Sequence, residues 1–423
     1  MMGRSPASSA RKHPRALAGA GLLTAAALVA TLWTPVGAAA GEAPPERGPA
    51  AIGNTGNTGN TSATGTGAAT ARQAACGDGS YQAEAVRSGN TWTARHGSTT
   101  VYTGGSMLDA MSAAVGSLSA GRTAKERVVV RGSGDMSAGS RLPLPSYTVL
   151  DVCGTINVTG SGSGDMAPVY ARGKRDIEVQ HLNVTGSPQY GIFMRNVDNL
   201  TLGRIDMRLS GGLGIRIDNH GDRDDPSENV RIDHVYVSGT AAHGVETYGV
   251  DRLTIGTVTA RGTGGSGLLL NDTTNAEVGR VDAEGAGTGT GYAAFRMANR
   301  NGRVGDSYPV NIHVGEVVAR GGGRGVFCVS ESGGAVIDRV DIAGTGSNSV
   351  LIENCYNVTL AALSGSVTGG GDVRIAARSE FANTRDVTIQ NLTVTDSALR
   401  ESPCGDNVTF RANTLVNSSS SVC

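Results

Sequence analysis

The sequence predicts an all-β protein whose body is a right-handed parallel β-helix of about ten coils, closed at its N-terminal end by a capping helix. Three observations predict this fold. Glycine accounts for 63 of the 423 residues and aromatic residues for only 4 %, which is typical of many short strands joined by tight turns. Strand-like apolar runs recur about every 23 residues, within the range of solenoid repeats. Helical patterns do not separate these runs, which favours a β-helix over a leucine-rich horseshoe.

The first 40 residues have the parts of an export signal. Several basic residues precede an apolar run over 16–33, and small residues at 38–40 offer a cleavage site. A transmembrane anchor is the alternative, but the run is short, rich in alanine and followed directly by the cleavage site. We therefore expect a signal peptide over 1–40 and a secreted mature protein that starts near Gly41 and has no membrane attachment.

The segment that follows is poor in core-forming residues. Residues 41–75 consist largely of Gly, Pro, Thr and Asn, so we expect a disordered linker there and a β-helix domain over 76–423. Within 106–118, apolar residues fall at helical spacing behind Ser106, a suitable N-cap. A helix there would shield the first coil from water, so we interpret 76–126 as the capping region.

The rest of the chain repeats one unit. Each unit starts with an apolar strand, and the predicted starts are Ile177, Leu200, Val230, Leu253, Ala276, Ile312, Val336, Val358 and Val387. A second, shorter strand follows a Gly-rich turn, as in 214–219, 244–249 and 267–272. Because side chains alternate along a strand, Ile215 and Ile217 should face inward and Asp218 outward.

Six cysteines follow the predicted signal peptide, and an even number in an exported chain predicts disulfides. No close Cys-x-x-Cys pair indicates a metal site. Sequence alone leaves several pairings open, and we favour pairing in sequence order: Cys76 with Cys153, Cys328 with Cys355, and Cys404 with Cys423. The middle pair lies about one repeat apart, so stacked coils would bring it together.

Three coils are lengthened, around 220–226, 299–309 and 379–384, and each extra segment follows the second strand. They should therefore emerge on one side of the solenoid, where insertions usually build the binding face. The first two would wall a groove whose floor is the outward row of the second strands.

This predicted floor is rich in ionisable groups. Since neighbouring strands lie roughly 4.8 Å apart, Asp218 would lie about 5 Å from Glu246 and about 10 Å from Asp272. These distances bracket the carboxylate separations of retaining and inverting glycosidases, and crowded carboxylates raise one pKa, as a catalytic acid requires. The candidate catalytic residues are Asp218, Glu246, Asp272, His243 and Tyr248. The candidate substrate-binding residues are His220, Asn271, Arg296 and Arg300.

From about Val128 onward the chain resembles the pectate-lyase-like superfamily of right-handed parallel β-helices. The stretches 243–249 (His-Gly-Val-Glu-Thr-Tyr-Gly) and 291–300 are similar to secreted actinobacterial β-helix proteins. The resemblance implies action on a polysaccharide. Asp224-Asp225 and His243-Gly244 match polygalacturonase motifs only in part and the Arg-Ile-Lys motif is absent, so no catalytic residue is carried over from that family.

Three functions follow as hypotheses. The first is a glycoside hydrolase that needs no cofactor. The second is a polysaccharide lyase or uronate epimerase, in which Asp222, Asp224 and Asp225 would bind Ca²⁺ while His243, Tyr248 or Arg296 handles the proton. The third is a non-catalytic glycan-binding or surface protein, although the floor has few aromatic platforms. The net charge of −1 argues against nucleic acid as a partner, and we expect a monomer that binds a polysaccharide or oligosaccharide.

Overall fold

The structure is a computed structural model that describes residues 75–287, 289 and 291–423. The predicted signal peptide over 1–40 lies outside the described residues, as does the predicted linker over 41–75 except for Ala75. Within the described part of the chain, no helix is long and apolar enough to cross a membrane.

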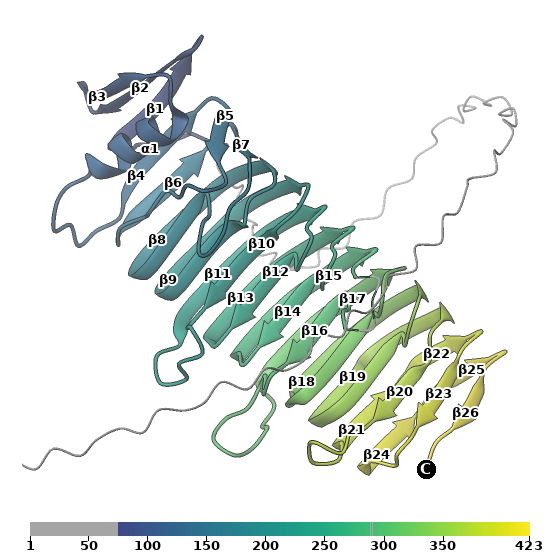
Figure 1. The fold of residues 1–423 in the computed structure, drawn as a ribbon. Helices are drawn as coiled ribbons and strands as arrows, with labels where there is room; N and C mark the ends of the chain where they lie inside the picture. Colours follow the sequence, from purple (N-terminus) through teal and green to yellow (C-terminus); the bar gives the residue numbers. More distant parts are fainter. Residues whose placement is uncertain (1–74, 288, 290) are drawn as a thin grey trace, which may run out of the picture. The chain divides into compact units, whose positions relative to one another are not determined.

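Residues 75–423 contain a right-handed parallel β-helix of about 13 turns, in which strands pair in parallel with those of the next turn (Figure 1). The predicted fold is confirmed, but the predicted ten coils are too few. The prediction started the repeats at Ile177, whereas β4 (Glu126–Arg131) and β6 (Thr148–Val152) already pair in parallel. Their strands are short, so the sequence pattern did not extend to them.

The N-terminal end is closed by a helix and by an antiparallel meander of β1 (Ala83–Ser88), β2 (Thr91–His96) and β3 (Thr99–Gly104). The helix α1 spans Met107–Gly116, and the hydroxyl of Ser106 accepts a hydrogen bond from the Asp109 N–H at 3.2 Å. The predicted capping helix is thus confirmed, together with its N-cap. The meander is an additional element of the cap that the helical pattern could not indicate.

From Val169 onward, each coil contributes a strand to one sheet, which we call the floor sheet. The floor sheet comprises β10 (Leu213–Asp218), β12 (Val245–Tyr248), β14 (Leu268–Asn271), β16 (Phe295–Ala298), β20 (Val373–Ala376), β23 (Ala398–Glu401), β26 (Ser419–Ser421) and the beginnings of β8 (Val169–Gly186), β9 (Tyr190–Leu209), β18 (Val326–Thr345) and β19 (Val350–Gly370). The remaining strands complete the coils: β5 (Gly134–Ser137), β7 (Thr155–Thr159), β11 (Ser227–Ser238), β13 (Val250–Arg261), β15 (Thr274–Glu284), β17 (Ile312–Arg320), β21 (Arg385–Gln390), β22 (Leu392–Thr395), β24 (Asp406–Arg411) and β25 (Thr414–Val416).

The predicted strand starts stack on one another with one exception. Ile312 pairs with Ala335 rather than with the predicted Val336, and Ala335 pairs in turn with Val358. Ala335 is fully buried whereas Val336 is only half-buried. The apolar pattern favoured the larger valine, but an irregular register just before this position, between Val329 and Ser332, turns the smaller alanine into the core.

The predicted alternation in the floor sheet is also found. Ile215, Ile217, Val245 and Thr247 are fully buried inside the coil. The buried Thr247 hydroxyl is satisfied by a hydrogen bond to the Thr273 hydroxyl at 2.9 Å, as a polar group in the core requires.

All three predicted disulfides are present: Cys76–Cys153, Cys328–Cys355 and Cys404–Cys423. The middle bond joins paired strands, β18 and β19, of adjacent turns. Three disulfides are typical of a protein that resides in an oxidising, extracellular environment.

The three predicted insertions follow β10, β16 and β20. Figure 1 shows these loops on the same side of the stack, between β10 and β11, β16 and β17, and β20 and β21. The insertions therefore lie beside the edge at which the floor strands end.

Candidate functional site

Outward side chains of the floor sheet form two rows that run from turn to turn. One row contains Arg216, Glu246 and Arg296, and the other contains Asp218 and Tyr248. Asp218 is thus in register with Tyr248, and Glu246 is in register with Arg216. The two carboxylates that the sequence placed side by side are diagonal neighbours, with an arginine between them.

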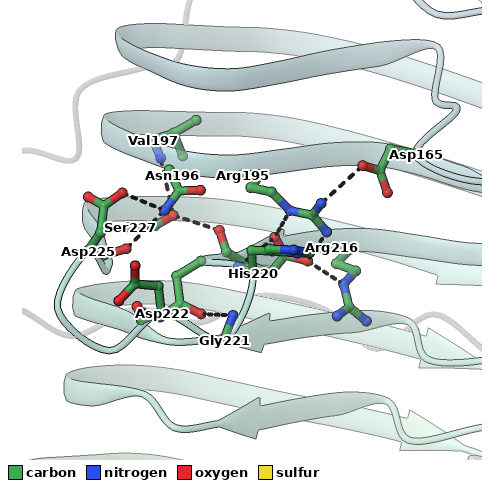
Figure 2. Close-up of polar contacts among 12 residues, drawn as sticks. Asp165, Arg195, Asn196, Val197, Arg216, His220, Gly221, Asp222, Asp225 and Ser227 are labelled. Atoms are coloured by element: carbon green, nitrogen blue, oxygen red, sulfur yellow. Dashed lines mark hydrogen bonds and ion pairs between the residues drawn. The ribbon is translucent and has the colours of Figure 1, made fainter. Parts of the chain in front are cut away.

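Asp218 is enclosed by two arginines, Arg195 and Arg216, which are labelled in Figure 2. Arg195 donates to both carboxylate oxygens, from Nε at 2.5 Å and from Nη2 at 2.8 Å, and Arg216 Nε donates at 2.9 Å. Burial works to raise the pKa of Asp218, but the hydrogen bonds and charges of the two arginines outweigh it and hold this pKa below its ordinary value. An acid so firmly ionised cannot serve as a proton donor near neutral pH, so Asp218 organises the arginines instead.

Glu246 has a different environment on the same face. Arg216 Nη1 donates to it at 2.9 Å and Asn271 Nδ2 donates at 3.2 Å, while Asn299 Nδ2 donates to Asn271 Oδ1 at 2.8 Å. Burial raises the pKa of Glu246, and the charge of Arg216 offsets this only in part. The chain of amides connects Glu246 to the loop after β16.

A pocket of about 460 Å³ lies where the floor strands end, and we call it the corner pocket. All three insertions contribute to it. The lining residues are Gly221, Arg223, Tyr248, Asp272, Asn299, Arg300, Ser330, Glu331 and Phe381. The pocket therefore brings together two candidate catalytic residues, Tyr248 and Asp272, and the candidate substrate-binding residue Arg300. The other candidate catalytic residues, Asp218, His243 and Glu246, do not line it.

Asp272 follows directly after β14 with a positive φ of 45°. Its side chain is 10 % exposed and forms an ion pair with Arg223 from the first insertion. Burial raises the pKa of Asp272, and Arg223 offsets this only in part. Asp272 is therefore the group in the pocket best suited to hold a proton.

Glu331 is a pocket residue that the sequence analysis did not select. It is ion-paired with Arg300, whose Nε lies 3.6 Å from the carboxylate. Its position in the coil could have identified Glu331 from the sequence. Asp272, Arg300 and Glu331 all follow closely after a floor strand and all have positive φ, so the stacking of coils brings them to one edge.

His243 lies at the entrance to β12. Its Nδ1 accepts a hydrogen bond from the Ser266 N–H at 2.9 Å, and its ring meets the edge of Tyr292 at a centroid distance of 5.6 Å. Burial, reinforced by the charges of Arg296 and Arg216, lowers the pKa of His243 to about 4. The ring is neutral near pH 7 and, because Nδ1 is an acceptor, carries its hydrogen on Nε2, so no lone pair remains to take a proton.

The acidic loop after β10 uses its carboxylates to fold itself. Asp222 Oδ1 accepts from the Asp224 N–H at 3.0 Å. Asp225 Oδ2 accepts from Asn196 Nδ2 at 2.9 Å (Figure 2). His220, in the same loop, adopts a positive φ of 59° and donates its N–H to Asp218 at 3.4 Å.

Asp222, Asp224 and Asp225 do not converge into a Ca²⁺ site. Within the ranges that the structure describes, the one group of three such ligands close enough for a metal is Cys76, Asp151 and Cys153, and its cysteines form a disulfide. The loop as folded therefore does not fit the cation.

Comparisons with known proteins complete the description. No protein-family model matches the chain, and no curated protein matches it. Among solved structures, the A-module of mannuronan C-5 epimerase AlgE4 from Azotobacter vinelandii is 13 % identical over 71 % of this chain and 89 % of that chain, with a TM-score of 0.41. An exopolygalacturonase from Thermotoga maritima is 11 % identical over 73 % and 88 %, with a TM-score of 0.42. The surface adhesin PfbA of Streptococcus pneumoniae is 11 % identical over 74 % and 88 %, with a TM-score of 0.32.

These similarities concern the fold. The three proteins differ from one another in their named activities.

Proposed function

We propose that this protein is a secreted enzyme that hydrolyses a glycosidic bond of a polysaccharide in the corner pocket. The observation that carries the proposal is the combination of two carboxylates there. Asp272 is nearly buried and has a raised pKa, while Glu331 is 32 % exposed and ion-paired with Arg300. Glycoside hydrolysis requires two carboxyl groups in one pocket, one to donate a proton and one to act as the base.

Their positions favour an inverting reaction. Asp272 and Glu331 follow floor strands two turns apart, which corresponds to roughly 10 Å between their backbones. Inverting enzymes hold their carboxyl groups roughly 6.5–9.5 Å apart, with room for a water molecule. In this scheme Asp272 gives its proton to the leaving glycosidic oxygen. Glu331 takes a proton from the water whose oxygen bonds to the anomeric carbon.

The remaining pocket residues serve substrate binding. Arg223 lies on an insertion and its side chain is 40 % exposed, so an entering sugar can displace it from Asp272 and leave that acid free to be protonated. Tyr248 and Asn299 offer hydrogen-bonding groups for sugar hydroxyls from the floor and from the second insertion.

The lyase or epimerase alternative has less support. Those reactions need a base that removes the proton from the carbon next to the carboxylate of the sugar. The Nδ1 of His243 already accepts a hydrogen bond from the Ser266 N–H. The acidic loop also does not offer a Ca²⁺ site.

The proposal is tested by incubating the purified protein with a panel of neutral and acidic polysaccharides and measuring new reducing ends. With the substrate so identified, D272N and E331Q should each lower the rate by roughly 10²–10⁴-fold, the usual contribution of an acid or base. E277Q is a control, because Glu277 is exposed on β15, away from the floor sheet.

Three outcomes contradict the proposal. A product that absorbs in the ultraviolet, as an unsaturated sugar does, would establish a lyase. Binding without release of reducing ends would establish a non-catalytic glycan-binding protein. Activity that survives both D272N and E331Q would move the reaction away from the corner pocket.

A further inference from the structure

Two arginines lie against one aromatic ring on the outward face of the floor sheet. Arg296 belongs to β16, and its register partner in β18 is Phe327. Arg324 precedes β18. The guanidinium carbons of Arg296 and Arg324 lie 5.3 Å and 4.6 Å from the centre of the Phe327 ring, so both cations contact the same aromatic ring.

Neither guanidinium forms an ion pair within the described part of the chain, although the Glu246 carboxylate acts electrostatically on Arg296 and the Glu353 carboxylate on Arg324. Arg296 Nε and Arg324 Nε and Nη1 are buried and find no hydrogen-bond partner within the described part of the chain. Arg324 is only 5 % exposed. The nearby carboxylate of Glu353 is engaged by Arg378 Nε at 2.8 Å. A buried cation without a partner is unfavourable, and the face of an aromatic ring compensates for this only in part.

The two arginines also disfavour each other. Burial lowers the pKa of Arg324, and the neighbouring charge of Arg296 lowers it further, although Glu353 counteracts both. Burial likewise lowers the pKa of Arg296. An anion placed between the two guanidinium groups would relieve the repulsion and satisfy the free N–H donors.

We propose that Arg296 and Arg324 form a binding site for an acidic group, a carboxylate or a sulfate ester, carried by the polysaccharide. The planar guanidinium matches both groups through paired N–H donors. Arg296 lies three residues before Asn299 of the corner pocket, roughly 10 Å along an extended strand, so the acidic group would sit on a sugar near the one that is cleaved. This assignment rests on the proposed function, because it takes the acidic group to be part of the substrate.

The test is a binding measurement without turnover, by calorimetry. The probes are an oligogalacturonate, its uncharged methyl ester and a sulfated oligosaccharide. The wild-type protein should bind at least one charged probe about 10-fold or more tightly than the ester, and the preferred probe distinguishes carboxylate from sulfate. R296Q and R324Q should each remove most of this preference. R374Q is the matched control, because Arg374 is exposed on β20 in the same outward row.

The thermal midpoint separates binding from folding. R324Q should keep or raise the midpoint, since the charge that it removes has no ion-pair partner in the described part of the chain, so lost binding would not reflect lost structure. Equal binding of charged and esterified probes, no binding of any charged probe, or wild-type binding by R324Q would overturn the inference. Hydrolysis of a neutral glycan, together with equal binding of charged and uncharged probes, would refute the binding site for an acidic group but not the proposed function. A charge preference without hydrolysis of any glycan would refute the proposed function and leave an anion site.

Discussion

Two regions of the same outward face differ in what surrounds their arginines. Around β10, Arg195 and Arg216 meet the carboxylates of Asp218 and Glu246. Three and four turns further along the floor sheet, Arg296 and Arg324 lie against the ring of Phe327 and form no ion pair within the described residues. Both regions are built on the same coil with the same alternation. The first region, which we call the complete region, pairs its arginines with carboxylates of the protein, whereas the second leaves buried N–H groups unpaired in the described residues, which is the basis of the proposed anion site.

We expect the largest effect from disrupting the complete region. D218N removes the buried carboxylate that Arg195 and Arg216 share. Arg195 keeps Asp165 and Arg216 keeps Glu246, but both lose the partner that they have in common, so the change should cost about 3–5 kcal/mol of unfolding free energy. D233N is the control: Asp233 forms a more exposed pair with Arg231, and its loss should cost within about 1 kcal/mol. Urea unfolding measures both. Equal costs would mean that the Asp218 cluster is no more than a surface ion pair.

One substitution in each region tests the contrast directly. R195M leaves Asp218 with one arginine and should cost about 2–3 kcal/mol. R324M removes a charge that has no partner and keeps an apolar side chain against Phe327, so stability should rise or fall by less than about 1 kcal/mol. The free energy of unfolding from denaturant titration decides between them. A larger loss for R324M than for R195M would show that Arg324 has a structural role.

Two carboxylates of the complete region should respond to pH in opposite directions. The folded-state pKa of Asp218 lies below its ordinary 3.8, so its contribution is present above pH 3.8 and is lost as the pH falls through the lower folded value. The folded-state pKa of Glu246 lies above its ordinary 4.5, so its contribution is full below pH 4.5 and is lost as the pH rises through the folded value. A tenfold difference in proton affinity between the folded and unfolded states corresponds to about 1.4 kcal/mol of unfolding free energy.

Unfolding free energies between about pH 3 and pH 7 check these signs. Wild type should exceed D218N most at neutral pH, with a gap that narrows on acidification. E246Q, which imitates the protonated acid, should match wild type in acid and exceed it at neutral pH. A gap between wild type and E246Q that runs the other way would mean that Glu246 is stabilised as a carboxylate.

A smaller effect is expected for the amide chain between Glu246 and the corner pocket. N299A removes the hydrogen bond to Asn271 and should cost about 1 kcal/mol. N275A is the matched control, because it removes an exposed hydrogen bond that Asn275 donates to Asp251 at the start of β15. With Asn271 less firmly held, NMR titration should show a change in the pKa of Glu246 in N299A and none in N275A. If both variants leave that pKa unchanged, the amide chain does not reach Glu246.

Much of the fold could be predicted because its signals are local. The alternation around Ile215 and the cap at Ser106 depend on neighbours within a few residues, and the lengthened coils at 220–226 and 299–309 show directly as gaps in the repeat. The prediction placed Val336 in the core where the structure has Ala335, because a bulge changes the register of the strand without changing the apolar pattern of the sequence. The site was less accessible: Asp272 and Arg300 were found as candidates, but Glu331 was not.

Period, spacing and composition were sufficient to predict the β-helix, the three disulfides and the side on which the insertions emerge. Which charges meet depends on the tertiary structure. Arg195 reaches Asp218 across 23 residues, and Arg216 reaches Glu246 across 30. Insertions of unequal length change the number of residues between equivalent positions of adjacent coils. The partner of a given arginine therefore depends on how the turns stack. For the same reason, only the stacked coils reveal that Arg296 and Arg324 have no partner in the part of the chain that the structure describes.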